Sequence, residues 1–256
     1  MLKLRIIPIL TWNGFALVKT KHFANPRMVG NAVQAARVYN SRGVDELFFL
    51  DISATAQRRK INTTLVSQIL RECAMPVAVG GGITTLDDIS ALLNIGADKV
   101  VLKTCVLEQP GFLAAAAKRF GSQALCVAVD TVRNHTKLVL HAPGFREWSA
   151  AEFVAYAENE GAGELCITSV DHEGALQGFD CEGLGELASH TGLPVVAAGG
   201  AGEPRHFLEL IQKVQVQALA AASIYHFTQY TPNDIKRLLR DNDLPIRYVA
   251  PGGIQR

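Results

Sequence analysis

The chain has 256 residues, 48% of them hydrophobic, and its 25 basic and 24 acidic residues leave a formal net charge of +1. Near-balanced charge without a basic run argues against nucleic acid or an anionic membrane surface as a partner, and no apolar stretch approaches the ~18 residues that cross a bilayer. The five cysteines are an odd number with no CxxC spacing, which is typical of reduced thiols in a cytoplasmic protein.

Short apolar runs alternate with amphipathic stretches along the chain. The apolar runs predict strands at residues 4–10, 46–52, 76–80, 98–104, 124–130, 164–170, 194–200 and 217–223. Helical periodicity covers residues 28–40, 61–73, 84–96, 110–121, 149–161, 181–189, 204–214 and 231–241. Eight strand–helix units without a composition break predict an α/β fold, a single (β/α)8 TIM barrel. A doubly wound open sheet is the alternative, but it explains the number of units less well.

The two halves of the chain repeat one another. PVAVGGG at 76–82 resembles PVVAAGG at 194–200, and the strands that follow end at Thr104 and Ser223. Thr11 and Asp130 are separated by the same 119 positions as Thr104 and Ser223. This spacing predicts two duplicated half-barrels, about 1–122 and 123–247, which an open sheet leaves unexplained. Residues 248–256 are rich in glycine and proline and are expected to form a flexible C-terminal tail.

Each half carries a glycine-rich turn, at residues 80–82 and 199–202, after its third strand. Parallel barrels hold their active sites at the carboxyl ends of the strands, called the mouth below. Glycine lets the backbone approach an oxyanion closely, and the N–H groups of the following helix face it. Thr104 and Ser223 could each add a hydroxyl group. Ordinary tight turns are the alternative, but two turns in register favour a ligand with two phosphates.

Three side chains at the mouth could carry chemistry. Asp130 ends the fifth strand and is either a general acid or base or a turn-capping aspartate, with equal weight. Lys19 follows the first strand and is either a phosphate ligand or a surface lysine. Thr11 ends the first strand, but threonine cannot accept a proton at neutral pH. The segment TSVDHEG, with Glu173 and Gly174, either lines the same site or is an ordinary polar loop. The histidines show no metal-ligand spacing, so no metal is predicted.

A set of motifs spreads over nearly the whole chain: RIIPIL, ALVK, GVDELFFLDI, VGGGITT, GADKV, FGSQ, CVAVD, GAGELCITSVDHEG, GFD, PVVAAGGAG and ALAAASIYHF. Together they resemble the cyclase subunit of imidazole glycerol phosphate synthase. The sister isomerase of histidine biosynthesis shares the duplication, but GAGELCITSVD and SIYHF fit the cyclase better. The resemblance implies a barrel without a cofactor that binds a bisphosphate ribonucleotide. It also implies that ammonia arrives from a partner glutaminase through the barrel core and that an imidazole ring is closed.

The resemblance implies a catalytic set and a phosphate-binding set at the mouth. Asp130 matches one catalytic aspartate, Lys19 matches a lysine near the first strand, and Thr11 replaces the other catalytic aspartate. The phosphate-binding set is Gly81, Gly82, Lys103, Thr104, Glu173, Gly174, Gly200, Ala222 and Ser223. Lys103 stands where the family has an asparagine and Glu173 where it has an aspartate. Residues 141–150 lack the family's Arg-x-x-Thr-Gly pattern.

The opposite, N-terminal face of the barrel matches the family more closely. The resemblance implies a ring of charges that gates the ammonia entrance, formed by Arg5, Glu46, Lys99 and Glu164. Two cations and two anions can pair around such a ring and tolerate burial, whereas each alone would be an ordinary surface charge. Asp98 matches a residue at the glutaminase interface. A glutaminase subunit is therefore the expected partner at this face.

An intact partner-facing end and a catalytic end that lacks one aspartate resemble a paralogous branch of this family, which serves the synthesis of acetamidino sugars. The main prediction is therefore an accessory subunit that docks a glutaminase and conducts ammonia. It would help a sugar amidotransferase to amidate a nucleotide-linked sugar for surface polysaccharides. Two alternatives stay open. One is an active imidazole-forming cyclase of histidine biosynthesis, and the other is a non-catalytic, phosphate-binding regulatory barrel.

Overall fold

The computed structural model describes residues 3–247, in which eight parallel strands form a closed barrel. Neighbouring barrel strands pair in chain order, and β1 closes the ring by pairing with β11, with Arg5 opposite Ala218. The barrel strands are β1 (Arg5–Trp12), β4 (Leu47–Asp51), β5 (Val77–Gly80), β6 (Lys99–Leu102), β7 (Leu125–Asn134), β9 (Glu164–Ser169), β10 (Val195–Ala198) and β11 (Ala218–Ala221). The prediction of a (β/α)8 barrel is confirmed. The two half-barrels stay a prediction, and the predicted tail at 248–256 lies outside the described residues.

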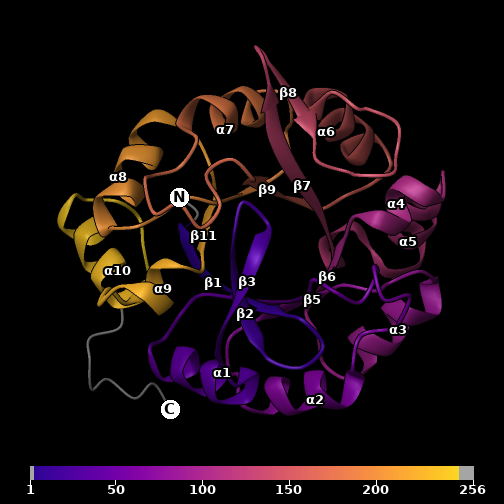
Figure 1. Cartoon of the computed structure of the whole chain (residues 1–256), viewed down its shortest axis with the longest axis horizontal. Helices are drawn as coiled ribbons and strands as arrows, with labels where there is room; N and C mark the ends of the chain where they lie inside the picture. The colour runs from indigo at the N-terminus through magenta and orange to yellow at the C-terminus, as the bar shows by residue number, and fades with distance from the viewer. Residues whose placement is uncertain (1–2, 248–256) are drawn as a thin grey trace.

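Helices surround the ring of strands (Figure 1). The longer helices are α1 (Ala32–Ser41), α2 (Thr63–Arg71), α3 (Leu86–Asn94), α5 (Phe112–Phe120), α6 (Ala150–Asn159), α7 (Cys181–Ala188), α8 (Pro204–Lys213) and α10 (Pro232–Asp241). Shorter segments are α4 (Thr104–Glu108), η1 (Ser122–Ala124) and α9 (Ile224–Phe227). Capping boxes fix the starts of α3, at Thr85 and Asp88, and of α6, at Ser149 and Glu152. Within residues 3–247, no helix combines the length and the apolar character that crossing a bilayer requires.

Two layers of apolar side chains hold the barrel together. The outer layer, between strands and helices, contains large side chains such as Phe49, Phe153 and Phe207. The inner layer includes many small side chains: Ala78, Cys126, Cys166, Ala198, Ala218 and Ala220, beside Ile7, Phe48, Val101 and Val196. Small inward side chains fill the barrel less completely than the bulky branched ones that usually pack such interiors. Three of these small residues, Cys166, Ala198 and Ala220, line a cavity that opens at the mouth.

Two hairpins at the mouth depart from the prediction. β2 (Leu17–Lys21) pairs antiparallel with β3 (Ala24–Gly30), and β8 (Lys137–Leu140) pairs with the end of β7. The β2–β3 hairpin is drawn across the middle of the ring (Figure 1). The prediction of a helix from residue 28 was wrong because Met28 belongs to β3. The helix begins at Ala32, after the Asn31 side chain accepts a hydrogen bond from Gln34 N and caps it.

Candidate functional site

A cavity of about 700 Å³ opens at the mouth of the barrel. This volume is within the range of small-molecule sites in proteins. Every residue predicted for catalysis or for phosphate binding lines it: Thr11, Lys19, Asp130, Gly81, Gly82, Lys103, Thr104, Glu173, Gly174, Gly200, Ala222 and Ser223. Closure of the barrel therefore brings together residues from both halves of the chain. The roles of these residues stay predictions.

Lys19 points into the barrel from β2 and is 2% exposed. Its Nζ donates to Ile9 O at 2.8 Å and to Thr11 Oγ1 at 3.2 Å, while Thr11 Oγ1 donates to Val18 O. Burial lowers the pKa of Lys19 to about 7, although the negative charge of Glu173 acts in the opposite direction. A lysine that titrates near neutral pH can both give and take a proton.

Asp130 shares its carboxylate with a lysine from the neighbouring strand. Lys103 follows β6 directly, and its Nζ lies 2.7 Å from Asp130 Oδ2 and 2.6 Å from His141 O. Lys103 was predicted to be a phosphate ligand, but in the structure its ammonium group is engaged by these two oxygens. The pair is partly solvated, with side-chain exposures of 22% for Lys103 and 15% for Asp130.

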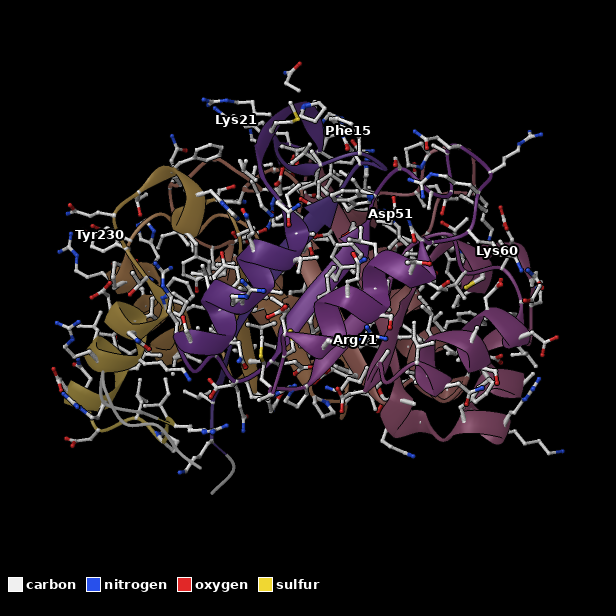
Figure 2. All side chains as sticks on the ribbon, turned by 90° about the horizontal axis from the view of Figure 1, so that it is seen from below. Phe15, Lys21, Asp51, Lys60, Arg71 and Tyr230 are labelled. Atoms are coloured by element: carbon white, nitrogen blue, oxygen red, sulfur yellow. The ribbon has the colours of Figure 1, made fainter. Side chains whose placement is uncertain are left out.

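Glu173 ties the β2–β3 hairpin to the loop after β9. Its Oε1 accepts a hydrogen bond from Thr20 Oγ1 at 3.0 Å, and its Oε2 accepts one from Phe23 N at 3.0 Å. Gly174 follows with a φ of +71°, and a Cβ there would lie 2.2 Å from Thr20 O, so only glycine fits. The hairpin therefore packs directly against the loop that lines the cavity. In a side view, Lys21 of the hairpin and Phe15 of the preceding turn stand above Asp51 at the mouth end (Figure 2).

The glycine-rich turns have a packing reason of their own. Gly81 has a φ of +107°, and a Cβ there would lie 2.1 Å from Asp51 O. Thr104 and Ser223, the hydroxyl residues predicted beside the two turns, both border the cavity. The tight turns and the oxyanion cradles that the sequence left as alternatives are therefore compatible, because the same backbone path serves both.

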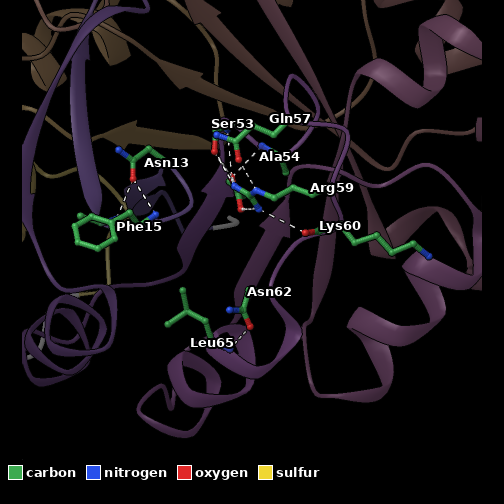
Figure 3. A network of polar contacts seen from close by, with 11 residues as sticks. Asn13, Phe15, Ser53, Ala54, Gln57, Arg59, Lys60, Asn62 and Leu65 are labelled. Atoms are coloured by element: carbon green, nitrogen blue, oxygen red, sulfur yellow. Dashed lines mark hydrogen bonds and ion pairs between the residues drawn. The ribbon is translucent and has the colours of Figure 1, made fainter.

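Asp51 and Arg59 form a network at the mouth that the sequence did not predict. Figure 3 shows Arg59 beside Ser53 and Gln57, two other residues of this network. Arg59 donates to both oxygens of Asp51, Nη1 to Oδ2 at 2.6 Å and Nη2 to Oδ1 at 2.8 Å. It also bonds Ser53 Oγ at 2.7 Å and Gln57 Oε1 at 2.7 Å. The network fixes the loop between β4 and α2 against the cavity wall. An acidic residue at the end of a barrel strand was the available signal, as it was for Asp130.

His226 is a second residue that sequence reasoning left without a place in the site. It lies in α9, and its buried Nε2 has no hydrogen-bond partner within the described part of the chain. Burial and the positive charge of Lys19 lower the pKa of His226 to about 4. The imidazole is therefore neutral at physiological pH. The influence of Lys19 on His226 acts across the fold, between β2 and α9, and residue spacing along the chain does not reveal it.

The four charged residues predicted at the N-terminal face form a closed ring. Arg5 donates to Glu46 and to Glu164. Lys99 Nζ lies 3.1 Å from Glu46 Oε1 and 2.7 Å from Glu164 Oε2. Both carboxylates are buried, so each needs its two cationic neighbours. The predicted interface residue Asp98 is exposed beside the ring, and its Oδ2 accepts a hydrogen bond from Val77 N at 2.9 Å.

Comparison with known proteins places this arrangement in a family. The histidine biosynthesis protein family matches residues 5–231. The chain is 40% identical over 252 residues to the imidazole glycerol phosphate synthase subunit HisF of Staphylococcus saprophyticus, which covers 96% of this chain and 100% of that protein. It is 38% identical to the subunits of the same name from Dehalococcoides mccartyi and Exiguobacterium sp.. These matches cover 96% and 98% of this chain, and 99% and 98% of the two relatives.

These relatives overturn the main functional prediction. The prediction of an accessory subunit for sugar amidation is wrong, because relatives at 38–40% identity over nearly the full chain are named as the synthase subunit. They give no support to the acetamidino-sugar branch or to a sugar amidotransferase partner. That prediction rested on Thr11 together with the intact charge ring, and this combination does not exclude the synthase subunit. The ammonium group of Lys19 lies 3.2 Å from the Thr11 hydroxyl. A titratable group is therefore present next to the position where the resemblance implies an aspartate.

Proposed function

Because this chain belongs to the histidine biosynthesis protein family, we propose that it is the cyclase subunit of an imidazole glycerol phosphate synthase. One observation carries the proposal. Asp130, the Thr11–Lys19 pair and the two glycine-rich turns all border one cavity at the mouth, while a closed charge ring lies at the opposite end of the barrel. The proposed reaction joins ammonia to a bisphosphate ribonucleotide. It yields imidazole glycerol phosphate and an aminoimidazole carboxamide ribonucleotide.

Two groups would divide the proton transfers of ring closure. Asp130 is a carboxylate at the end of the barrel interior and would act as one general acid or base. Lys19 would act as the other, because burial places its pKa at about 7 and so populates both protonation states at neutral pH. Thr11 would orient Lys19 through the 3.2 Å hydrogen bond between Lys19 Nζ and Thr11 Oγ1. In this scheme, Thr11 orients the ammonium group and Lys19 transfers the proton.

The two glycine-rich turns would hold the two phosphates at opposite sides of the cavity. Gly82 and Thr104 would bind one phosphate, and Gly200 and Ser223 would bind the other, through backbone N–H groups and hydroxyls. A cavity of about 700 Å³ leaves room for both ends of the ligand at once. Fixing both phosphates would place the reacting carbonyl and the incoming ammonia between Asp130 and Lys19.

Ammonia would enter at the N-terminal face. A glutaminase subunit would dock there, next to Asp98, and release ammonia at the ring formed by Arg5, Glu46, Lys99 and Glu164. The inner layer of small side chains extends from the ring to the cavity: Cys126 and Ala218 pair in register with Glu164 and Arg5 of the ring, and other members of the layer line the cavity, namely Cys166, Ala198 and Ala220. A small neutral molecule would pass such a lining more readily than an ion, because an apolar interior offers an ion no compensation for lost hydration.

The test is to supply the purified chain with the bisphosphate ribonucleotide and an ammonium salt, which removes the need for a glutaminase. We expect turnover on the order of 1 per second, typical of a biosynthetic enzyme. Asp130→Asn should lower it by about 10²-fold or more. The exposed lysine variant Lys118→Met is the matched control and should keep full activity. A folded wild-type protein that forms no product would refute the proposal.

A further inference from the structure

Lys103 occupies a position between two possible anionic partners. It follows β6 and precedes Thr104, and it lines the same cavity as Gly82. Its ammonium group nevertheless bonds Asp130 Oδ2 at 2.7 Å and His141 O at 2.6 Å. Both groups are therefore committed to each other in the structure, although the proposed reaction needs Asp130 as a base and the phosphate end needs a cation.

The two halves of the barrel differ at this position. Lys103 precedes Thr104 in the first half, whereas the apolar Ala222 precedes Ser223 in the second half. A cation beside the hydroxyl is therefore a property of one phosphate end only. The first half is also the one whose neighbouring strand, β7, carries Asp130. The additional cation, Lys103, therefore lies next to Asp130, the proposed catalytic carboxylate.

We propose that Lys103 is a positioning residue with two positions, one on Asp130 and one on the phosphate bound beside Thr104. This inference rests on the proposed function. Without a ligand, the Lys103 ammonium group occupies Asp130 Oδ2 through a charge-assisted hydrogen bond of 2.7 Å, so this oxygen is not available to a substrate proton. When a phosphate group arrives, Lys103 turns toward it and releases Asp130 to accept a proton.

Charge and geometry favour the exchange. A phosphate group near neutral pH carries between one and two negative charges and presents three acceptor oxygens, whereas Asp130 carries one charge and presents two. Lysine is a point charge on a flexible four-carbon stem, so it can change partners without moving the backbone. The Lys103–Asp130 pair is also partly solvated, at 22% and 15% side-chain exposure, so water can replace the lost contact during the move. The backbone oxygen of His141 can take a water in the same way.

A double-mutant cycle with inorganic phosphate tests the exchange. Isothermal titration of the full chain would measure phosphate affinity in the wild type, Lys103→Met, Asp130→Asn and the double variant. Asp130→Asn removes a repulsive charge in either background, but it also frees Lys103 where the lysine is present. We therefore expect Asp130→Asn to tighten phosphate binding about tenfold more in the presence of Lys103 than in the Lys103→Met background, the factor that one charge-assisted hydrogen bond supplies.

Three results would overturn the proposal. Equal tightening in both backgrounds would mean that Lys103 does not change partners. Weaker phosphate binding after Asp130→Asn would mean that the carboxylate holds Lys103 in place for phosphate, so that one position serves both. Wild-type protein that does not bind phosphate would also contradict it.

Controls separate this inference from the proposed function. Lys103→Asn replaces Lys103→Met if the methionine variant does not fold, and the thermal unfolding midpoint reports folding for each protein. Lys118→Met should leave phosphate affinity unchanged. Because the cycle measures binding alone, the expected coupling without any cyclase turnover would refute the proposed function and leave the exchange standing. Cyclase turnover without the coupling would support the proposed function and overturn the exchange.

Discussion

Replacing Lys19 with methionine should stabilise the protein at neutral pH and flatten the dependence of its stability on pH. Lys19 is 2% exposed, and burial lowers its pKa from 10.5 to about 7. Between these values the unfolded chain binds a proton that the folded chain has lost, so the free energy of unfolding rises with pH across this window. At ~1.4 kcal/mol per pKa unit, the shift from 10.5 to about 7 costs the folded protein about 5 kcal/mol below pH 7.

Urea unfolding at constant ionic strength, measured from pH 6 to pH 10, would check this prediction. The stability advantage of Lys19→Met over the wild type should be several kcal/mol near pH 7 and should shrink steadily toward pH 10. Lys118→Met, at an exposed position in α5, is the matched control and should follow the wild-type curve. Parallel curves for the wild type and Lys19→Met would refute the reasoning, because they would mean that Lys19 keeps its proton in the fold.

Three further predictions concern stability and turnover. Arg5→Met should lower the free energy of unfolding by about 3 kcal/mol, because it removes one of the two cations that pair with two buried carboxylates; urea unfolding should show no comparable loss for Arg37→Met, whose ion pair is on the surface. Gly200→Ala should destabilise by at least ~2 kcal/mol more than Gly144→Ala; both have positive φ, but only at Gly200 would the Cβ meet a backbone oxygen, at 2.0 Å, so equal losses would rule out the close contact. If the proposed mechanism holds, Thr11→Val should lower kcat about tenfold with little change in KM, since it removes the hydroxyl that hydrogen-bonds the Lys19 ammonium group. An unchanged kcat would exclude Thr11 from the proposed mechanism.

The barrel could be predicted because its strands and helices follow simple periodicities and repeat across the two halves. The mouth residues could be predicted for a related reason: in a parallel barrel, a residue at the carboxyl end of a strand must lie at the mouth. The β2–β3 hairpin could not be predicted, because most of Ala24–Gly30 is exposed and so shows no apolar alternation. The sequence around Met28 therefore looked like the start of the following helix.

Side-chain pairing was beyond the sequence for a different reason. Position along the chain placed Lys103 and Asp130 at the ends of neighbouring strands, but an ammonium group there can form a hydrogen bond with any of several oxygens. Lys103 pairs with Asp130 because of distances of a few ångströms, which are fixed only in the folded chain. The same holds for Lys19, whose side chain is buried against β1 and therefore has a pKa of about 7. Because the sequence does not show this burial, Thr11 was interpreted as a sign that the chain no longer catalyses the cyclase reaction.

The fate of the ammonia nitrogen tests the central claim most directly. The purified chain would be incubated with the bisphosphate ribonucleotide and ¹⁵N-labelled ammonium chloride, and the products followed by nitrogen NMR. The proposed cyclase activity predicts that the label enters the ring of imidazole glycerol phosphate and that this signal grows about 10²-fold more slowly, or slower still, with Asp130→Asn. Label that stays in the ammonium signal while the wild-type protein remains folded would contradict the account.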